Sequence, residues 1–333
     1  MRRTAPQRYK STSLSILPLT QTNSDCYATR TGPINIALSG LLFDHQPIAD
    51  FASAARKIGY MAIELRGTNH QLPPTAKDSF VQQVAEVFSD IEIVNIASHT
   101  GNFALLDEDA ATSERRLAHR YFRWASNLNA QSVRIWPGWI SAQDAEPQHW
   151  DRAARHLQWC ANAARDLGVK VAIEMHHGTL AESSHGANRL LDTVDHEAIG
   201  LILDPANLLQ TPEPFGASAI APIWDRLLHV HVKDHAVTTH DDASAYPYRD
   251  YRRHIGKWIK NISPPQQRVG PSWFAKRSLG TGHVPWPSIL TELRQRGYAG
   301  HLIVESEVGP GMASGRELAQ REFDTITRWL ELT

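Results

Sequence analysis

The amino-acid sequence predicts an α/β protein, a single (β/α)8 TIM barrel with an N-terminal extension and a long loop after the seventh strand. Apolar runs of strand length alternate with helical patterns about every thirty residues, which indicates parallel strands joined by crossover helices. No Gly-x-Gly-x-x-Gly turn follows the first strand, and this argues against the competing doubly wound sheet. Polar residues recur at the carboxyl ends of the strands, where barrels place their chemistry.

Composition narrows the class further. The 333 residues are 42% apolar and 21% charged, with a formal net charge of −1. Such a balance offers no basic surface for nucleic acid. Cys26 and Cys160 are the only cysteines, which excludes a disulfide framework and indicates a reducing cytoplasm. The first apolar patch, 14–19, is too short and polar for a membrane span or a signal peptide.

The chain divides into an extension, 1–33, and a barrel, 34–333. The extension is rich in Arg, Ser, Thr, Gln and Pro, and its first acidic residue is Asp25. We expect a loose segment or a strap that holds another subunit, with a transit peptide as the alternative. The protein is therefore expected to be an oligomer, either of this chain alone or with a second kind of subunit.

The first half of the barrel holds four strand–helix units. Their strands and helices are, in order, 34–42 and 47–58, 61–65 and 75–88, 91–97 and 113–127, and 132–136 and 147–167. Apolar residues of the second helix recur at helical spacing, at Phe80, Val81, Val84 and Val87. The third helix opens with Ser113, and Gly168 ends the fourth.

The second half holds the other four strands, 170–175, 199–204, 227–234 and 301–305. Its helices are expected at 187–194, 217–226, 286–296 and 317–332, the third ending at Gly297. A segment without periodicity, about 236–278, follows the seventh strand. Long ordered loops are usually lids or binding loops. We expect a lid or a subunit contact, and its aromatic and basic residues leave nucleic-acid binding as the alternative.

The seventh strand reads Leu-Leu-His-Val-His-Val-Lys-Asp from Leu227. Side chains alternate across a strand, so its apolar residues share one face while His229, His231 and Lys233 share the other. Two imidazoles and an ammonium on one face are typical of the inside of a site.

Four consecutive strand ends carry metal-ligand residues, namely Glu174, Asp204, His231 and Glu305. Neighbouring units of a barrel place these ends side by side. Three carboxylates raise one another's pKa unless a cation offsets the repulsion. Three oxygens and one nitrogen suit one divalent ion, Mn²⁺ first, with Mg²⁺, Co²⁺ or Zn²⁺ as alternatives. The competing interpretation pairs these acids with Arg134 and Lys233 in a structural network.

The motifs resemble a known family, the xylose isomerase-like barrels, in the sugar phosphate isomerase/epimerase branch. The resembling segments are 172–178 (Ala-Ile-Glu-Met-His-His-Gly), 203–207 (Leu-Asp-Pro-Ala-Asn), 229–234 (His-Val-His-Val-Lys-Asp) and 279–286 (Leu-Gly-Thr-Gly-His-Val-Pro-Trp). The resemblance covers residue 33 to the C terminus. It implies a metal held by the four ligands and, as in ketose epimerases, Glu174 and Glu305 as an acid/base pair.

Around these residues the sequence offers substrate contacts. We expect them from His177, His99, Arg134, Lys233, Asn207 and His283. Each of three residues also has an alternative role. His177 would support the metal ligands from behind, Arg134 would pair with Glu174, and His99 would have an ordinary capping role.

The resemblance implies an isomerase or epimerase that moves a proton beside the carbonyl of a sugar or keto-sugar. The alternative is a lyase or dehydratase for a keto-polyol or 3-keto-glycoside, including subunits that cleave C-glycosides. Asn207 stands where several ketose epimerases carry His, which places the epimerase activity in doubt. An endonuclease IV-type repair enzyme needs a further His at the same position, and the neutral charge also argues against it. A binding module without catalytic activity is expected to lack one of the four ligand residues, whereas this chain carries all four.

Overall fold

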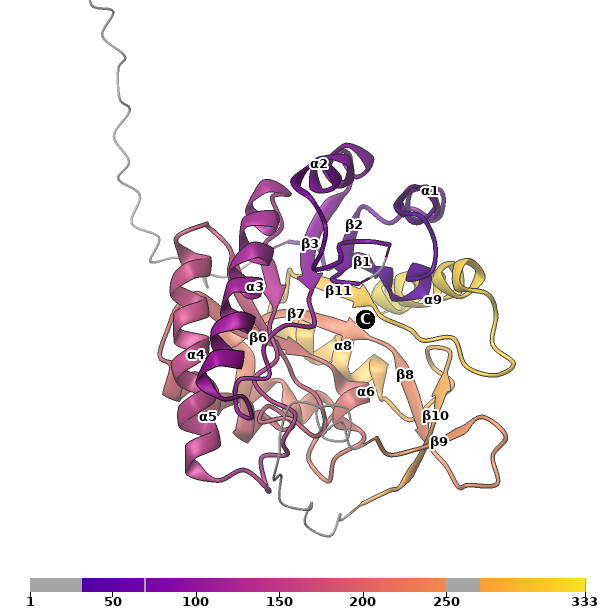
Figure 1. Ribbon diagram of the computed structural model, residues 1–333. Coiled ribbons are helices and arrows are strands. Elements are labelled where there is room, and N and C mark those ends of the chain that lie inside the picture. Colours follow the sequence, from indigo (N-terminus) through magenta and orange to yellow (C-terminus); the bar gives the residue numbers. More distant parts are fainter. Residues whose placement is uncertain (1–31, 69, 250–269, 333) are drawn as a thin grey trace, which may run out of the picture.

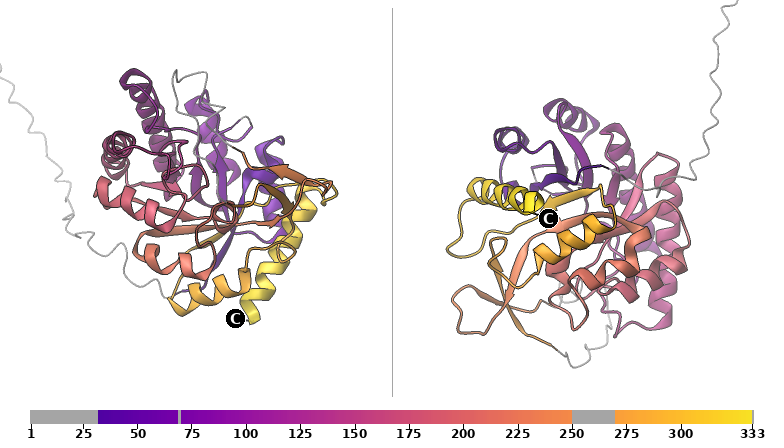
Figure 2. Two further views of the ribbon diagram at one scale, coloured as in Figure 1. Left: turned by 90° about the horizontal axis from the view of Figure 1, so that it is seen from below. Right: turned by 180° about the vertical axis from the view of Figure 1, so that it is seen from behind.

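The computed structural model describes residues 32–68, 70–249 and 270–332. Among them, eight parallel strands form a closed barrel in the order β1-β11-β7-β6-β5-β4-β3-β2, with helices around its outside (Figures 1 and 2). The barrel strands are β1 Asn35–Ser39, β2 Ala62–Arg66, β3 Glu92–Ala97, β4 Ser132–Arg134, β5 Lys170–Glu174, β6 Ile199–Leu203, β7 Leu227–Val232 and β11 His301–Val304. The predicted barrel is confirmed. The predicted extension, 1–33, falls almost wholly outside the described residues.

The helices cover the barrel because each carries one apolar face. They are α1 Ile48–Ile58, α2 Asp78–Val87, α3 Glu108–Asn127, α4 Pro147–Arg165, α5 Ser184–Val194, α6 Pro205–Leu208, α8 Trp286–Gln295 and α9 Gly315–Leu332. Three short 3-10 helices, η1 Gly40–Phe43, η2 Ala217–Ala219 and η3 Ala221–Arg226, complete the set that the structure describes. Among the described residues no helix is both long and apolar enough to cross a membrane.

Two helix predictions need correction. Helix α3 begins five residues before the predicted start, because the Asp107 side chain accepts a hydrogen bond from the backbone N–H of Ala110 (2.9 Å) and caps the helix there. The predicted helix 217–226 is instead the pair η2 and η3. Pro222 lacks the N–H that an α-helix would need at that position.

The segment after β7 also differs from its prediction. It was expected to be a loop at about 236–278, but β8 Asp234–Val237, β9 Ala245–Pro247 and β10 Trp273–Arg277 form an antiparallel sheet in the order β8-β10-β9. Residues 250–269 of the segment lie outside the described part. This small sheet projects from the barrel beside the carboxyl end of β7 (Figure 1). Its role as a lid or a subunit contact stays a prediction.

The inside of the barrel has an apolar layer and, further along the strands, a polar layer. Small and branched apolar residues form a cluster from four adjacent strands, Ala37, Ala62, Val94 and Ile303. Residues further along the same strands are polar and fully buried, among them Ser39, Glu64 and Asn95. Buried polar groups are costly unless they are paired, and their pairing builds the site described next.

Candidate metal centre and active site

The four predicted ligands come together at the carboxyl ends of adjacent strands β5, β6, β7 and β11. Glu174, Asp204, His231 and Glu305 each offer a ligand atom, and these atoms all lie within 4.8 Å of one another. All four side chains are buried. Strand adjacency produced this cluster, because Ile303 pairs with His231 and Glu174 pairs with Ile202 across the sheet.

Asp204 is held by the short helix that follows it. Its Oδ1 accepts from the backbone N–H of Asn207 (2.9 Å), the N-cap hydrogen bond of α6. The Asn207 side-chain amide donates to Asp204 Oδ2 and to Glu174 Oε1, both at 2.8 Å. Asn207 therefore fixes two predicted ligands relative to each other.

Two cations contact the carboxylates. Arg134 donates to Glu174 Oε2 at 2.5 Å, and Lys233 Nζ lies 2.6 Å from Asp204 Oδ2 and 2.7 Å from Glu305 Oε2. Burial would raise the pKa of Glu174, but Arg134 holds it below its ordinary value. Burial opposes ionisation of Glu305 as well, and His231 and Lys233 keep its pKa well below the usual range. The predicted pairing of these acids with bases is thus present.

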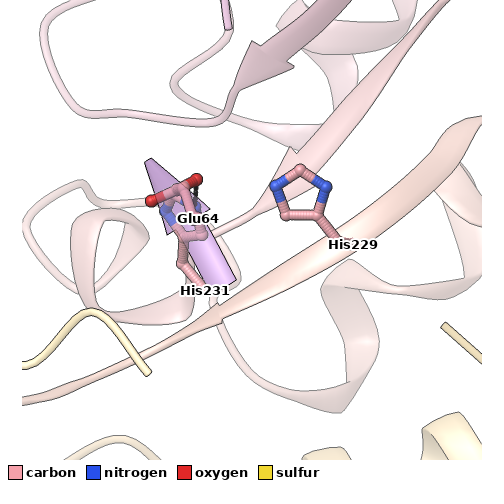
Figure 3. A group of neighbouring side chains, drawn as sticks. All are labelled: Glu64, His229 and His231. Carbon is pink, nitrogen blue, oxygen red and sulfur yellow. Dashed lines mark hydrogen bonds and ion pairs between the residues drawn. The ribbon is translucent and has the colours of Figure 1, made fainter. Parts of the chain in front are cut away.

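The two ring nitrogens of His231 face different groups. Nδ1 lies 3.2 Å from Glu305 Oε2, 3.7 Å from Glu174 Oε1 and 3.8 Å from Asp204 Oδ2. It is buried and has no hydrogen-bond partner among the described residues. On the other side, Nε2 lies 3.1 Å from Glu64 Oε2 (Figure 3). A histidine that ligates a metal commonly donates its second nitrogen to a carboxylate in this way.

Glu64 is itself anchored by the barrel interior. Its two oxygens accept from Ser39 Oγ (2.8 Å) and from Asn95 Nδ2 (2.7 Å). Ser132 Oγ in turn donates to Asn95 Oδ1 at 2.8 Å. Side chains of four adjacent strands, β1 to β4, thereby set the orientation of His231.

The donor set fits a divalent cation. Glu64 and the three carboxylate ligands carry four negative charges, whereas Arg134 and Lys233 supply two permanent positive charges against them. With His231 neutral, two negative charges remain, and the unpartnered Nδ1 is aimed at the carboxylate oxygens. A divalent ion offsets the charge and satisfies the nitrogen. The buried cluster is thus consistent with a divalent metal site.

His229 belongs to a second set of metal-type donors, with Glu64 and His231. Figure 3 shows its ring beside this pair, on the same strand as His231. Burial lowers the pKa of His229 to about 3, so the ring is neutral. Because Glu64 already accepts from His231, the contact between these two residues is explained without an ion.

Three of the predicted substrate contacts share one cavity. Asn207, Lys233 and His177 line a space of about 60 Å³ beside the ligand cluster. The remaining lining residues are His176, Gln210, His235, Tyr246, Arg249, Lys276 and Glu307. We call this space the catalytic cavity. Arg134 is buried and donates to Glu174, which is the pairing given above as its alternative role.

The structure does not bring His99 and His283 to this cavity. His99 is exposed, and its Nε2 lies 3.3 Å from the Arg66 guanidinium. His283 is also exposed, and its Nδ1 accepts from the backbone N–H of Val237 (3.1 Å) in β8. Substrate contact by either residue stays a prediction. The His99 ring is nevertheless near the ligand cluster, because partial desolvation lowers its pKa to about 3 while Arg134, Glu174 and Glu305 also influence it.

Sequence reasoning passed over several residues of the site. Glu64 is assigned no role from the sequence, because its partner His231 is 167 positions away. Glu307 lies 2.9 Å from Lys276 and lines the catalytic cavity with His235. The period of two that marks Glu305 and Lys233 extends to Glu307 and His235, so this alternation could have indicated both.

Comparisons with known proteins identify the family of this chain. The family model described as xylose isomerase-like TIM barrel matches residues 52–329. The inosose dehydratase of Lacticaseibacillus casei is 24% identical over 170 residues, which are 51% of this chain and 51% of that protein, so the chain spans about half the length of that relative. The inosose dehydratase of Geobacillus kaustophilus is 22% identical over 307 residues, 86% of this chain and 89% of that protein.

Solved structures support the fold. The probable 3-DHS dehydratase from Bacillus anthracis superposes with a TM-score of 0.67 at 16% identity, covering 88% of this chain and 99% of that one. The 3-keto-D-glucoside 4-epimerase from E. coli gives a TM-score of 0.65 at 14% identity, covering 90% of this chain and 100% of that one. Dehydratases and epimerases thus share this architecture. The family match extends over most of the chain, and the protein therefore belongs to the xylose isomerase-like TIM barrel family.

Proposed function

We propose that this protein is a divalent-metal-dependent lyase that eliminates water or another leaving group beside the carbonyl of a keto-polyol or 3-keto-glycoside. The observation that carries the proposal is the buried cluster of Glu174, Asp204, His231 and Glu305 next to a polar cavity. The relatives named inosose dehydratase favour elimination. The sequence analysis ranked isomerase or epimerase first and lyase second, and these relatives reverse that order.

The bound ion, with Mn²⁺ as the first expectation, supplies Lewis-acid polarisation of the substrate carbonyl, which acidifies the neighbouring C–H. Glu174, Asp204, His231 and Glu305 would hold it. The donors are three carboxylates and one imidazole without sulfur, which suits Mn²⁺, Mg²⁺ or Co²⁺ better than it suits zinc.

The chain's own residues perform the proton transfers. Glu174 and Glu305 approach from β5 and β11, with β6 and β7 between them, so they can address different sides of a bound substrate. One carboxylate removes the proton beside the carbonyl, and the C–H electron pair forms the enolate. When this pair returns, the bond to the β-hydroxyl breaks. The carboxyl group that removed the proton passes it to the departing hydroxyl, which leaves as water.

Lys233 and Asn207 complete the arrangement. Both contact ligand carboxylates and line the catalytic cavity. Their hydrogen-bond donors can also reach substrate oxygens there. His177 lines the same cavity, with its ring centroid 4.2 Å from that of His176.

Epimerisation of a keto-sugar is the second candidate, because it starts with the same proton removal. It requires a second group that returns the proton to the opposite face. Asn207 cannot transfer a proton, and it is already bonded to two carboxylates. In an epimerase mechanism, Glu174 and Glu305 would therefore have to exchange protons with the two faces of the substrate carbon.

The test is incubation of the Mn²⁺-loaded protein in deuterated water with inososes, free ketoses and 3-keto-glycosides, followed by NMR. We expect deuterium uptake beside the carbonyl together with an eliminated, unsaturated product. Deuterated starting material and its epimer, without elimination, would instead establish the second candidate.

Glu305→Gln provides the control for this reaction. We expect turnover to fall by about 10²–10⁴-fold, the usual contribution of a positioned acid or base. The far-UV circular dichroism should match that of the wild type. Unchanged turnover would remove Glu305 from the mechanism.

A further inference from the structure

A second and larger cavity lies at the same end of the barrel. Its volume is about 470 Å³, which is within the range of small-molecule sites. Loops after β4, β5 and β6 build its walls together with Tyr248 and the first turns of helices α4 and α5. The lining residues besides Tyr248 are Ser141, Ala142, Gln143, Trp150, Glu182, Ser183, His185, Gly186, Arg189, Gln210, Thr211, Pro212 and Glu213. We call it the distal cavity.

The walls of the distal cavity are held by one partly buried carboxylate. Glu182 Oε1 accepts from the hydroxyl of Ser141 and from the backbone N–H of Ala142 (2.8 Å). Its Oε2 accepts from the backbone N–H of Gly178 (3.0 Å), four residues after Glu174. One side chain therefore ties the loop after β4 to the loop that follows a predicted metal ligand.

The two cavities adjoin each other. Gln210 lines both of them. Tyr248 lines the distal cavity, and its ring centroid lies 5.1 Å from that of His177, which lines the catalytic cavity. Aromatic contacts continue from His177 to His176 (4.2 Å) and to Trp139 (5.2 Å). An aromatic wall thus runs along the junction, and such walls pack against the C–H faces of rings.

The volumes of the two cavities indicate that each holds a different part of the substrate. About 60 Å³ beside the ligands is well below the several hundred Å³ of a typical ligand pocket. The distal cavity supplies the missing volume. Its lining mixes amide, hydroxyl, carboxylate and guanidinium groups with Trp150, over which Arg189 lies at 4.1 Å. This combination of hydrogen-bonding groups and ring surface suits a ring that bears hydroxyl groups.

We propose that the distal cavity binds the leaving group of the substrate, a hydroxyl-bearing ring joined by a glycosidic bond to a keto-sugar whose carbonyl lies at the metal centre. This inference rests on the proposed lyase function and narrows its substrate to a 3-keto-glycoside. The carboxylate takes the proton at C2, the electron pair forms the enolate, and its return breaks the bond between C1 and the glycosidic oxygen. That oxygen takes the proton that the carboxylate removed from C2, so the ring leaves as a neutral alcohol. No oxidant is consumed, because the substrate already carries the keto group.

Binding is measured by calorimetry with an unoxidised disaccharide, which has no keto group and cannot react, and with a free hexose. Ala142→Phe fills the distal cavity from its wall. Ala221→Phe adds the same ring at an exposed position outside both cavities. We expect Ala142→Phe to weaken disaccharide binding about tenfold or more, while Ala221→Phe leaves it within twofold. Equal disaccharide affinity in the two variants would overturn the inference.

Kinetics supply a second readout, with a 3-keto-disaccharide and the matching free keto-hexose. Glu213 lines the distal cavity, whereas Glu197, at the amino end of β6, is an exposed control of the same type on the opposite face. We expect Glu213→Ala to raise KM for the 3-keto-disaccharide several-fold without changing KM for the keto-hexose, and Glu197→Ala to change neither. A parallel rise for both substrates would overturn the inference.

The two proposals can fail separately. If the wild type eliminates from free keto-polyols and the Ala142→Phe variant binds the disaccharide as the wild type does, the distal-cavity inference is wrong and the lyase function stands. If the disaccharide binds in the distal cavity but no panel compound exchanges a proton, the lyase function is wrong.

Discussion

His231 is the residue on which the predicted metal site depends most, since its two nitrogens connect two layers of the barrel interior. Nδ1 faces the carboxylate ligands, while Nε2 contacts Glu64. Burial would lower the pKa of His231, but Glu305 and Glu64 raise it well above its ordinary value. A bound cation would replace the proton between His231 and the carboxylates, so Glu64 is expected to tune metal affinity.

We predict that Glu64→Gln weakens Mn²⁺ binding by about 10–100-fold, the usual effect of losing the carboxylate behind a histidine ligand. The amide retains the shape but removes the negative charge that makes the imidazole a better donor. Calorimetric titration with Mn²⁺ measures the change. Glu92→Gln, at the exposed amino end of β3, is the matched control, and equal affinity of the two variants would contradict the assignment.

Lys233 is expected to oppose metal binding, whereas Glu64 supports it. Its ammonium contacts one oxygen each of Asp204 and Glu305, and both carboxylates raise its pKa well above the ordinary value despite burial. The ammonium therefore competes with a cation for the same oxygens. Release of Lys233 from these oxygens would direct it toward the substrate.

We predict that Lys233→Met tightens Mn²⁺ binding by about tenfold or more, because charges about 4 Å apart in a protein interact by several kcal/mol. Turnover should fall in the same variant, since the substrate loses a donor. Lys170→Met, at the amino end of β5, should leave affinity unchanged. Weaker Mn²⁺ binding by Lys233→Met would show that the lysine supports the ion rather than competing with it.

At the scale of elements, helix α9 is tied to the carboxyl end of β7 through a turn that begins at Leu279. The fully buried Glu322 of α9 accepts from the Leu279 backbone N–H at 3.0 Å and 3.2 Å. Asp234 accepts from the N–H groups of Gly280 and Gly282, both at 3.0 Å. Two carboxylates thus hold the turn that precedes α8, within the 279–286 motif of the sequence.

Burial raises the pKa of Glu322 from 4.5 to about 7. Between these two pH values the folded state binds more protons than the unfolded state, so the free energy of unfolding decreases as the pH rises. The stabilisation is complete below about pH 4.5 and lost above about pH 7, and its size is about 3 kcal/mol.

We predict that Glu322→Gln removes this dependence and makes the protein more stable than the wild type at pH 8. Urea unfolding at pH 5 and pH 8 measures it. Asp324→Asn on the same helix is the control, because the Asp324 side chain is exposed. An identical pH dependence in Glu322→Gln and the wild type would contradict the prediction.

At the scale of the whole molecule, a metal at the carboxyl ends of β5, β6, β7 and β11 would link half of the barrel strands. A ligand that binds only the folded state stabilises it by about 2.7 kcal/mol at a hundred times its Kd. We therefore predict that a chelator lowers the Tm of the metal-loaded protein by about 4 °C or more.

The measurement is differential scanning calorimetry with Mn²⁺ and with excess chelator. Asp204→Asn should lose most of the difference, because it removes a ligand charge while the amide can still accept the hydrogen bond from the Asn207 backbone. A wild-type Tm that is the same in both conditions would argue against a metal in this cluster.

The local patterns were sufficient for much of this structure. Alternation of strands and helices predicted the closed barrel. The adjacency of consecutive strand ends, with side-chain alternation in β7, predicted which side chains meet. Both depend on interactions over a few residues and on the regular geometry of neighbouring units. The segment after β7 was predicted less well, because β8 pairs with β10 across a gap of more than thirty residues.

The sequence by itself therefore determined the fold class and which four side chains of metal-ligand type cluster at the strand ends. Only the tertiary structure decided the partner of His231, the position of Lys233 between two carboxylates, and the distal cavity. The physical reason is separation along the chain. A strand's periodicity specifies the face on which a side chain lies, whereas its partner from a distant strand, and the space left between loops, depend on how the barrel closes.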